Sequence, residues 1–223
     1  MRVSYVASLD LERVLDPSND AWSATPSEEV ALIGTPVGLQ PTAAVRAAWT
    51  GKKIGAVERV ALAALHDGKS LAFRLEWSDP TENREIADTT QFTDAAGVLL
   101  PSTAQSQVMT MGAPGAAVNA WYWRADGDQG RHVVAEGLGT SRTLDTTLVR
   151  GRGVWKEGRW HVVIARALRI DSRDPIAQLA AGEPTRFAVA VWDGASSERA
   201  GIKAFSGDWR ELVLDAAAPA GRV

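Results

Sequence analysis

The feature that most constrains the fold is a pair of alternating apolar segments joined by a tight turn. Residues 57–65 (VERVALAAL) are mostly apolar, and the turn HDGK follows them. In residues 71–77 (LAFRLEW) apolar side chains recur at every second position. This period of two is typical of a strand with one buried face. A glycine-containing turn between two such strands predicts an antiparallel hairpin.

Similar signals recur along the rest of the chain. A second hairpin is expected at residues 153–155 and 160–168, around a turn at 156–159, and single strands are expected at 92–101, 118–123, 185–193 and 209–214. Few helices intervene between these segments, and composition does not change along the chain. We therefore predict an all-β protein, an antiparallel β-sandwich that forms a single domain over residues 1–223.

The remaining segments carry weaker signals. Repeated X-Pro steps in residues 1–55 disfavour helix before each proline, so short strands and loops are expected there. Glycines in residues 126–152 predict long loops or irregular strands. One short helix is expected at residues 175–181, because Asp174 suits an N-cap, a proline follows it, and Gly182 suits a stop.

Composition excludes several classes of function. The formal net charge is −3 and the isoelectric point is near 5.7, so nucleic acid is not an expected partner. The absence of cysteine excludes disulfides, thiolate metal sites and covalently attached c-type haem within this chain. No apolar run is long enough for a membrane span, and residues 1–16 lack the apolar core of a signal peptide, so no signal of its own is expected.

Rare residue types gather in residues 105–125. Met109 and Met111 share one face if this segment is a strand, and Asn119, Trp121 and Trp123 share one face of the strand that follows. A thioether is a soft metal ligand, and flat aromatic walls with an amide would suit a planar cofactor. The alternative is that the methionines fill gaps in the core and the tryptophans pack inside the sandwich.

Lysine is rare, and one lysine has an unusual setting. Lys203 lies in an apolar context, between Ile202 and Ala204, whereas the other lysines fall in turns or loops. Desolvation disfavours an ammonium group, and the neutral amine is a competent metal ligand. The alternative is a surface lysine whose stem lies along an edge strand. The sequence contains no G-x-S-x-G, P-loop, H-E-x-x-H or Rossmann motif, and its three histidines are scattered.

Three blocks of the sequence resemble one family. They are TMGAPG leading to VNAWYW (residues 110–123), AALH and LEW in the first hairpin (63–77), and FAVAVW followed by ERAGIKAFSG (187–207). Together they resemble the haem-binding γ subunit of ethylbenzene dehydrogenase, whose family includes the γ subunits of dimethylsulfide dehydrogenase, selenate and chlorate reductases and steroid C25 dehydrogenases. The resemblance covers most of the chain and keeps the order of its elements.

The resemblance implies an immunoglobulin-like or DOMON-like sandwich, with one or a few short helices, that binds one b-type haem without a covalent bond. The family's axial ligands, a methionine and a lysine, correspond to Met111 and Lys203. Met109 is the rival sulfur, and Met111 is preferred because the family's ligand directly precedes the glycine. Surface arginines such as Arg124, Arg166 and Arg199 are candidates to pair with haem propionates or with carboxylates of a partner.

The resemblance also implies partners. The family's γ subunit has no catalytic site of its own and transfers electrons between the iron–sulfur clusters of a β subunit and an external carrier such as a cytochrome c. Substrate chemistry belongs to an α subunit with a bis-molybdopterin guanine dinucleotide molybdenum centre, and hydroxylation of a hydrocarbon or sterol is the expected reaction. The expected location is the periplasm, reached by co-export with a partner that carries a twin-arginine signal. The alternative function is a ligand-binding sandwich, such as a carbohydrate-binding module that uses its nine tryptophans for stacking.

Overall fold

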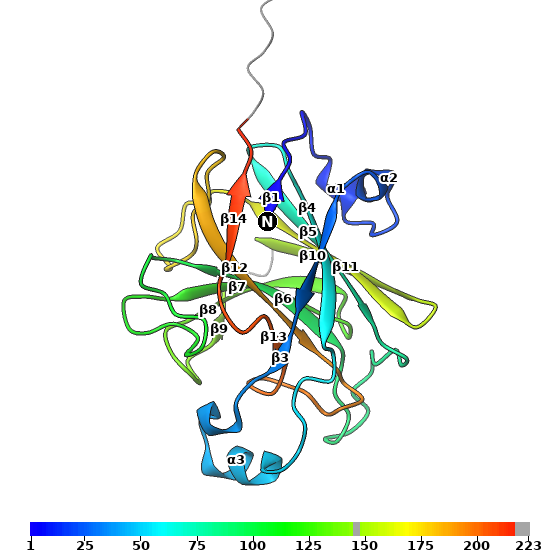
Figure 1. Cartoon of the computed structure of the whole chain (residues 1–223), viewed down its shortest axis with the longest axis vertical. Helices are drawn as coiled ribbons and strands as arrows, with labels where there is room; N and C mark the ends of the chain where they lie inside the picture. Colours follow the sequence, from blue (N-terminus) through cyan, green and yellow to red (C-terminus); the bar gives the residue numbers. More distant parts are fainter. Residues whose placement is uncertain (145–147, 217–223) are drawn as a thin grey trace, which may run out of the picture.

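Two packed β-sheets form the molecule in the computed structural model, which describes residues 1–144 and 148–216 (Figure 1). The larger sheet, nine-stranded among these residues, runs in the order β1 (Arg2–Val3), β14 (Arg210–Leu214), β12 (Pro184–Trp192), β6 (Ala95–Pro101), β7 (Val118–Arg124), β8 (Gln129–Ala135) and β9 (Arg142–Thr143), with β13 (Ala204–Phe205) on β12 and β3 (Ile33–Gly34) on β13. The smaller sheet, five-stranded in the same part of the chain, runs β10 (Val149–Lys156), β11 (Arg159–Ala167), β5 (Ser70–Ser78), β4 (Arg59–His66) and β2 (Ser27–Ala31). Strand pairing is antiparallel except between β1 and β14. The all-β, antiparallel sandwich is therefore confirmed.

The core between the sheets is dominated by tryptophans. The Trp77 and Trp160 rings stack with centroids 6.2 Å apart, and Trp123 meets Trp160 edge-on at 5.0 Å. All of these side chains are buried. Both hairpins expected from the sequence are present, as β4–β5 and β10–β11.

Residues 126–152 were expected to form long loops or irregular strands, and the structure forms strands in part of this region, namely β8 and the first half of β10. Glycines in and next to this region allow close packing of the strands. A Cβ on Gly130 would lie 2.5 Å from the Val149 carbonyl oxygen, and one on Gly153 would lie 2.2 Å from the Trp123 ring. These distances are far below a normal contact, so glycine is required where the edges of the two sheets meet.

The expected helix at residues 175–181 is absent, because its backbone groups bind elsewhere. The Ala177 N–H donates to Asn119, the Ala177 carbonyl accepts from Arg166, and Leu179 N–H donates to the Leu168 carbonyl. The side chains of Ile176, Ala177 and Leu179 are buried. Tertiary contacts thus override the capping signals of this segment.

Short helices occur instead in residues 1–55, where short strands and loops were expected. They are α1 (Leu11–Val14), α2 (Asp20–Ser23), the 3-10 helix η1 (Val37–Leu39) and α3 (Ala43–Trp49). Asp10, Asn19 and Thr42 cap the three α-helices by accepting backbone N–H bonds. Helices α1 and α2 lie beside the smaller sheet, whereas α3 lies at the opposite end of the molecule (Figure 1). No helix among the described residues is long and apolar enough to cross a membrane.

Candidate functional site

A cavity of about 450 Å³ lies on the outer face of the larger sheet, away from the core between the sheets. Its floor on β6, β7 and β12 consists of small or aliphatic side chains, namely Gly97, Leu99, Ala120, Ala188 and Ala190. Loops from residues 35–41, 108–111, 138–143 and 200–203 form its walls. The volume is in the range of small-molecule and cofactor sites, and the small floor residues leave room for a bulky ligand.

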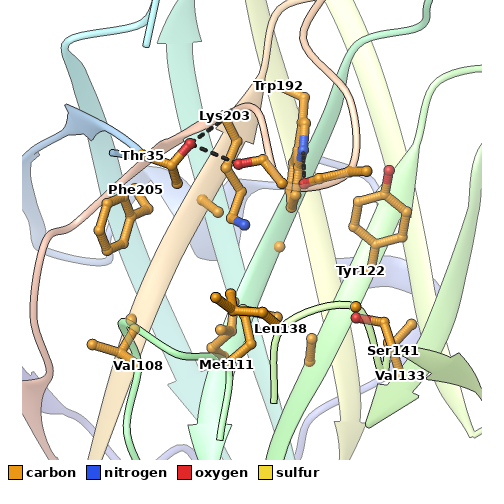
Figure 2. A pocket seen from close by; sticks show the side chains of 18 of the residues that line it. Thr35, Val108, Met111, Tyr122, Val133, Leu138, Ser141, Trp192, Lys203 and Phe205 are labelled. Atoms are coloured by element: carbon orange, nitrogen blue, oxygen red, sulfur yellow. Dashed lines mark hydrogen bonds between the residues drawn. The ribbon is translucent and has the colours of Figure 1, made fainter. Parts of the chain in front are cut away.

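Lys203 projects into this cavity from the segment before β13 (Figure 2). The Thr35 N–H donates to the Lys203 carbonyl at 3.0 Å, and the Thr35 hydroxyl donates to the Gly201 carbonyl at 2.6 Å. These bonds fix the backbone and leave the amine to the cavity. The side chain is buried, and burial lowers the pKa of the Lys203 amine to about 8.

The Lys203 amine has an aromatic neighbour rather than an acidic one. It lies 5.5 Å from the centre of the Trp192 ring, and no carboxylate among the described residues forms an ion pair with it. The Trp192 N–H donates to the Ala200 carbonyl at 3.0 Å, which ties the ring to the segment that carries Lys203. Of the two interpretations of Lys203, its burial supports a lysine in apolar surroundings over one on the surface.

Met111 lies across the cavity from Lys203, and the lysine side chain points toward it (Figure 2). Its conformation is unusual for a residue with a Cβ, because φ is 56°. Hydrogen bonds hold it, from Met111 N–H to the Val108 carbonyl at 3.1 Å and from Gly137 N–H to the Met111 carbonyl at 3.0 Å. The next residue, Gly112, has φ 85°, and a Cβ there would lie 2.7 Å from the Ala135 carbonyl oxygen.

The sequence suggested a strand for the two methionines, but both lie in a turn at residues 108–111. Both line the cavity. Met109 is 38% exposed at the rim, whereas Met111 is half-buried and packs against the apolar residues of the cavity floor. Met111 is therefore the better enclosed of the two sulfur donors.

Asn119, Trp121 and Trp123 point away from the cavity, so the structure does not bring them to Met111 and Lys203. All three side chains are fully buried in the core between the sheets. Asn119 Oδ1 accepts hydrogen bonds from Arg166 at 3.0 Å and from the Ala177 N–H at 3.2 Å. The alternative interpretation, that this face of the strand packs inside the sandwich, is the one the structure supports.

The opposite face of β7 contributes Ala120 and Tyr122 to the cavity, and this face was missed. Tyr122 is largely enclosed, burial raises the pKa of its hydroxyl to about 12, and its ring meets Trp192 edge-on at 5.1 Å. Strict alternation along the strand, together with the rarity of tyrosine in this chain, was the available signal.

The arginines at the cavity are Arg131 and Arg142, rather than those named from the sequence. Arg166 is buried in the core, where its guanidinium lies 4.7 Å from the Trp121 ring centre. Among the other two candidates, Arg124 pairs with Asp126 at 2.7 Å, and Arg199 stacks on an aromatic ring. Arg131 and Arg142 lie in a region expected to form long loops or irregular strands, so the sequence did not show that their side chains face the cavity.

Comparison with known proteins identifies the family. The family model described as "Ethylbenzene dehydrogenase" matches residues 19–147 and 138–204, which include both Met111 and Lys203. The chain belongs to the ethylbenzene dehydrogenase family. The resemblance carried by the methionine and lysine blocks is thereby confirmed.

Relatives in this family are subunits of oxidoreductases. The chain is 33% identical over 216 residues to the γ subunit of chlorate reductase from Ideonella dechloratans, covering 95% of this chain and 83% of that one. It is 26% identical over 215 residues to the γ subunit of dimethylsulfide dehydrogenase from Rhodovulum sulfidophilum, covering 92% and 78%. A Haloferax mediterranei protein, described as a candidate heme subunit of a respiratory nitrate reductase, is 33% identical over 194 residues. This match covers 86% of this chain and 66% of that protein.

These relationships place the chain among the γ subunits of multi-subunit dehydrogenase and reductase complexes, in which catalysis belongs to another subunit. Among solved structures, a family 9 carbohydrate-binding module from Caldicellulosiruptor kristjanssonii, in complex with cellotriose, superposes with a TM-score of 0.55. The identity is 12%, and the match covers 100% of this chain and 97% of that module. At this identity the likeness shows the sandwich fold alone.

Proposed function

We propose that this family member binds one b-type haem in the cavity, with Met111 and Lys203 as axial ligands, and serves as an electron-transfer subunit. The observation that carries the proposal is the buried Lys203 amine that points across an apolar cavity toward Met111. Nitrogen and thioether donors on opposite sides of one space suit the axial positions of a haem iron. The relative described as a heme subunit supports the choice of group.

The surroundings of Lys203 lower the cost of using its amine as a ligand. A ligating lysine must lose its proton, and burial already holds the pKa of Lys203 at about 8. At pH 7 deprotonation then costs on the order of 1 kcal/mol, against roughly 5 kcal/mol for an ordinary lysine. The hydrogen bonds of Thr35 and Trp192 to neighbouring carbonyls hold the segment in place without involving the amine.

The cavity walls fit the other properties of the group. Its apolar floor on Gly97, Ala120 and Ala190 excludes water and suits a flat macrocycle. Arg131 and Arg142 line the cavity and offer cationic partners for propionate groups, which would compete with Asp174, 2.6 Å from Arg142, and with Asp126, 4.0 Å from Arg131. When bound, the haem would supply a one-electron redox centre whose potential is raised by thioether ligation and by burial.

The partners and the location are part of the same proposal. The γ-subunit relatives support an α subunit with a bis-molybdopterin guanine dinucleotide molybdenum centre, an iron–sulfur β subunit and an external carrier such as a cytochrome c. We place the complex in the periplasm, co-exported with a partner that has a twin-arginine signal. Deleting that signal is expected to retain this chain in the cytoplasm. Hydrocarbon or sterol hydroxylation rests on the family model, and substrate assays of the purified complex test it against chlorate, nitrate and dimethylsulfide.

The carbohydrate-binding alternative finds no platform of exposed tryptophans among the described residues. Seven of the nine tryptophans are buried, and the remaining two, Trp155 and Trp209, are half-buried. A sugar needs an exposed aromatic face to stack on. Among the described residues, no tryptophan is exposed at the surface, and Trp192 is the one tryptophan that lines the cavity.

The experiment that tests the proposal is reconstitution of the purified chain with haem b, followed by absorption spectra in both redox states. We expect a Soret band and sharp α and β bands on reduction, with one haem per chain. A chain that takes up no haem, or one whose magnetic circular dichroism matches bis-histidine ligation, would overturn it. Titration with cello-oligosaccharides by calorimetry tests the alternative on the same preparation.

A further inference from the structure

Three aspartates from separate loops meet at one end of the sandwich, apart from the haem cavity. Asp79 follows β5 of the smaller sheet, whereas Asp94 precedes β6 and Asp193 follows β12 in the larger sheet. One carboxylate oxygen from each lies within 4.8 Å of the others. Asp79 is 2% exposed and Asp94 is fully buried. The cluster therefore joins the two sheets through buried acidic groups.

The hydrogen bonds of the cluster leave one buried oxygen without a partner. Asp94 accepts from the N–H groups of Asn83 and Gly194, each at 2.8 Å, and from the Trp160 indole at 2.9 Å. Asp193 accepts from Ser196 through both of its oxygens. Asp79 Oδ1 accepts from the N–H and the hydroxyl of Thr81, but the buried Asp79 Oδ2 accepts from no described group.

No positive charge offsets these carboxylates among the described residues. None of the ion pairs found there includes Asp79, Asp94 or Asp193. The indole N–H of Trp77 acts weakly on Asp79, yet it forms no hydrogen bond of acceptable geometry. Burial raises the pKa of Asp79, and it raises that of Asp94 to about 7. Gathering such groups without a counter-charge is costly, and a bound cation removes that cost.

We propose that Asp79, Asp94 and Asp193 bind one divalent cation, and that the cation is Ca²⁺. The donors are oxygens only, and Ca²⁺ is a hard cation that takes carboxylate oxygens at 2.3–2.6 Å. Two oxygens on opposite sides of one such ion are about 5 Å apart, so oxygens within 4.8 Å of one another can share it. The unpartnered Asp79 Oδ2 supplies the free lone pairs that a ligand needs.

The site would act as a clamp on the segment that carries Lys203. Asp193 is the first residue after β12, and the chain runs from it directly to Lys203. The buried Glu198 strengthens this segment, because its Oε2 accepts from Asp193 N–H and its Oε1 accepts from the N–H groups of Gly55 and Ala56. A cation on Asp193 would therefore fix the start of the segment, while Thr35 fixes its end.

Terbium luminescence on the full-length, haem-free chain tests the site directly. Tb³⁺ binds at Ca²⁺ sites, and Trp160 donates a hydrogen bond to Asp94, close enough to sensitise the ion. We expect saturable emission on excitation of tryptophan, competed by Ca²⁺ at lower concentration than by Mg²⁺. Asp79→Asn and Asp193→Asn are each expected to weaken Tb³⁺ binding by about tenfold or more. The exposed Asp20→Asn is the matched control and should bind as the wild type does.

Thermal unfolding with Ca²⁺ or with EDTA provides the second readout. Ca²⁺ is expected to raise the melting temperature of the wild-type and Asp20→Asn chains, but not that of the Asp79→Asn or Asp193→Asn chain, because only a ligand of the folded state stabilises it. If the Asp79→Asn chain fails to fold, the Asp193→Asn chain tests the site, because Asp193 is half-buried and its substitution disturbs the core less. Absence of saturable emission, or an equal Ca²⁺ shift in all variants, would overturn the proposal and indicate carboxyl groups held by a shared proton and the Trp77 N–H. Neither readout depends on haem, so this result and the haem result are separable.

Discussion

The Lys203 amine lies 5.5 Å from the centre of the Trp192 ring, in a cavity wall that provides no acidic partner from the described residues. The two influences on this amine oppose each other. An aromatic face favours the ammonium form, whereas burial disfavours it. Burial dominates, because the pKa of Lys203 falls to about 8. In the haem-free protein Lys203 is therefore a cation destabilised by burial, whereas in the holoprotein it is proposed to be a neutral amine.

This relationship predicts a pH dependence of the haem-free protein. The pKa of Lys203 is about 8 when folded and near 10.4 when unfolded, so the unfolded chain binds more protons between these values. The free energy of unfolding should rise with pH across this window, by at most about 1.4 kcal/mol per pH unit. Urea unfolding from pH 8 to 10 measures it. Lys203→Met should lose this slope and the exposed Lys69→Met should keep it; equal slopes in all three chains would contradict the burial argument.

A matched pair of substitutions tests which methionine provides the sulfur ligand. Met111→Leu keeps the volume of the side chain but removes the thioether, so the low-spin haem spectrum should be lost. Met109→Leu makes the same change at the exposed rim and should leave the spectrum nearly intact. Absorption and electron paramagnetic resonance spectra of the reconstituted chains distinguish the two. Loss of low-spin haem in Met109→Leu alone would reverse the assignment.

The cavity floor provides a test of haem binding that leaves both ligands in place. Ala120→Phe directs a ring into the cavity from β7, so haem uptake should fall sharply. The side chain enters space outside the core, and the free energy of unfolding should change by less than about 1.5 kcal/mol. Ala44→Phe, on the exposed face of α3, is the control. Full haem uptake by Ala120→Phe would show that the haem lies elsewhere.

The contact between the sheet edges predicts a loss of stability without loss of the site. Gly153→Ala places a Cβ 2.2 Å from the Trp123 ring, and overpacking of this kind costs about 1–3 kcal/mol. Gly38→Ala is the control, because its Cβ would meet nothing within 4 Å. Denaturant unfolding of both chains gives the comparison. Equal stabilities would mean that β7 and β10 are free to move apart.

The order of carriers can be tested in the complete complex. A complex assembled with Lys203→Ala is expected to reduce its iron–sulfur clusters with substrate at the normal rate, but to pass electrons slowly to an external acceptor. Rapid-mixing spectroscopy of the clusters and steady-state reduction of the acceptor measure the two steps. Loss of cluster reduction in this complex would place the haem between the substrate and the clusters.

The sequence predicted the sandwich because each long strand shows its own alternation of side chains. It predicted Met111 and Lys203 as the opposed donors through the family resemblance, and the structure places both at one cavity. It missed the helices near the N-terminus, since helices this short depend on single caps such as Asp10. It also assigned a helix to the segment around Ala177, whose backbone binds Asn119 and Arg166 instead.

The error at Asn119, Trp121 and Trp123 has a different cause. Alternation identifies the two faces of a strand, but it does not state which face meets the core when both are apolar. The large aromatic residues of β7 pack between the sheets, and the smaller face around Ala120 lies under the loops. In a sheet covered on both sides, the face with smaller residues leaves the space for a ligand. Asp94, which is buried and accepts from Asn83, Gly194 and Trp160, carried no local signal of its setting.

The two faces of β7 have different roles: one packs in the core, and the other lines the cavity. Odd-numbered positions such as Trp121 and Trp123 pack in the core between the two sheets. Even-numbered positions such as Ala120 and Tyr122 belong to the cavity alone. Substitutions at these even-numbered positions can therefore change the ligand site while the core packing, and with it the fold, is kept. The likeness to the carbohydrate-binding module, at 12% identity, shows that a sandwich of this fold tolerates almost complete replacement of its sequence.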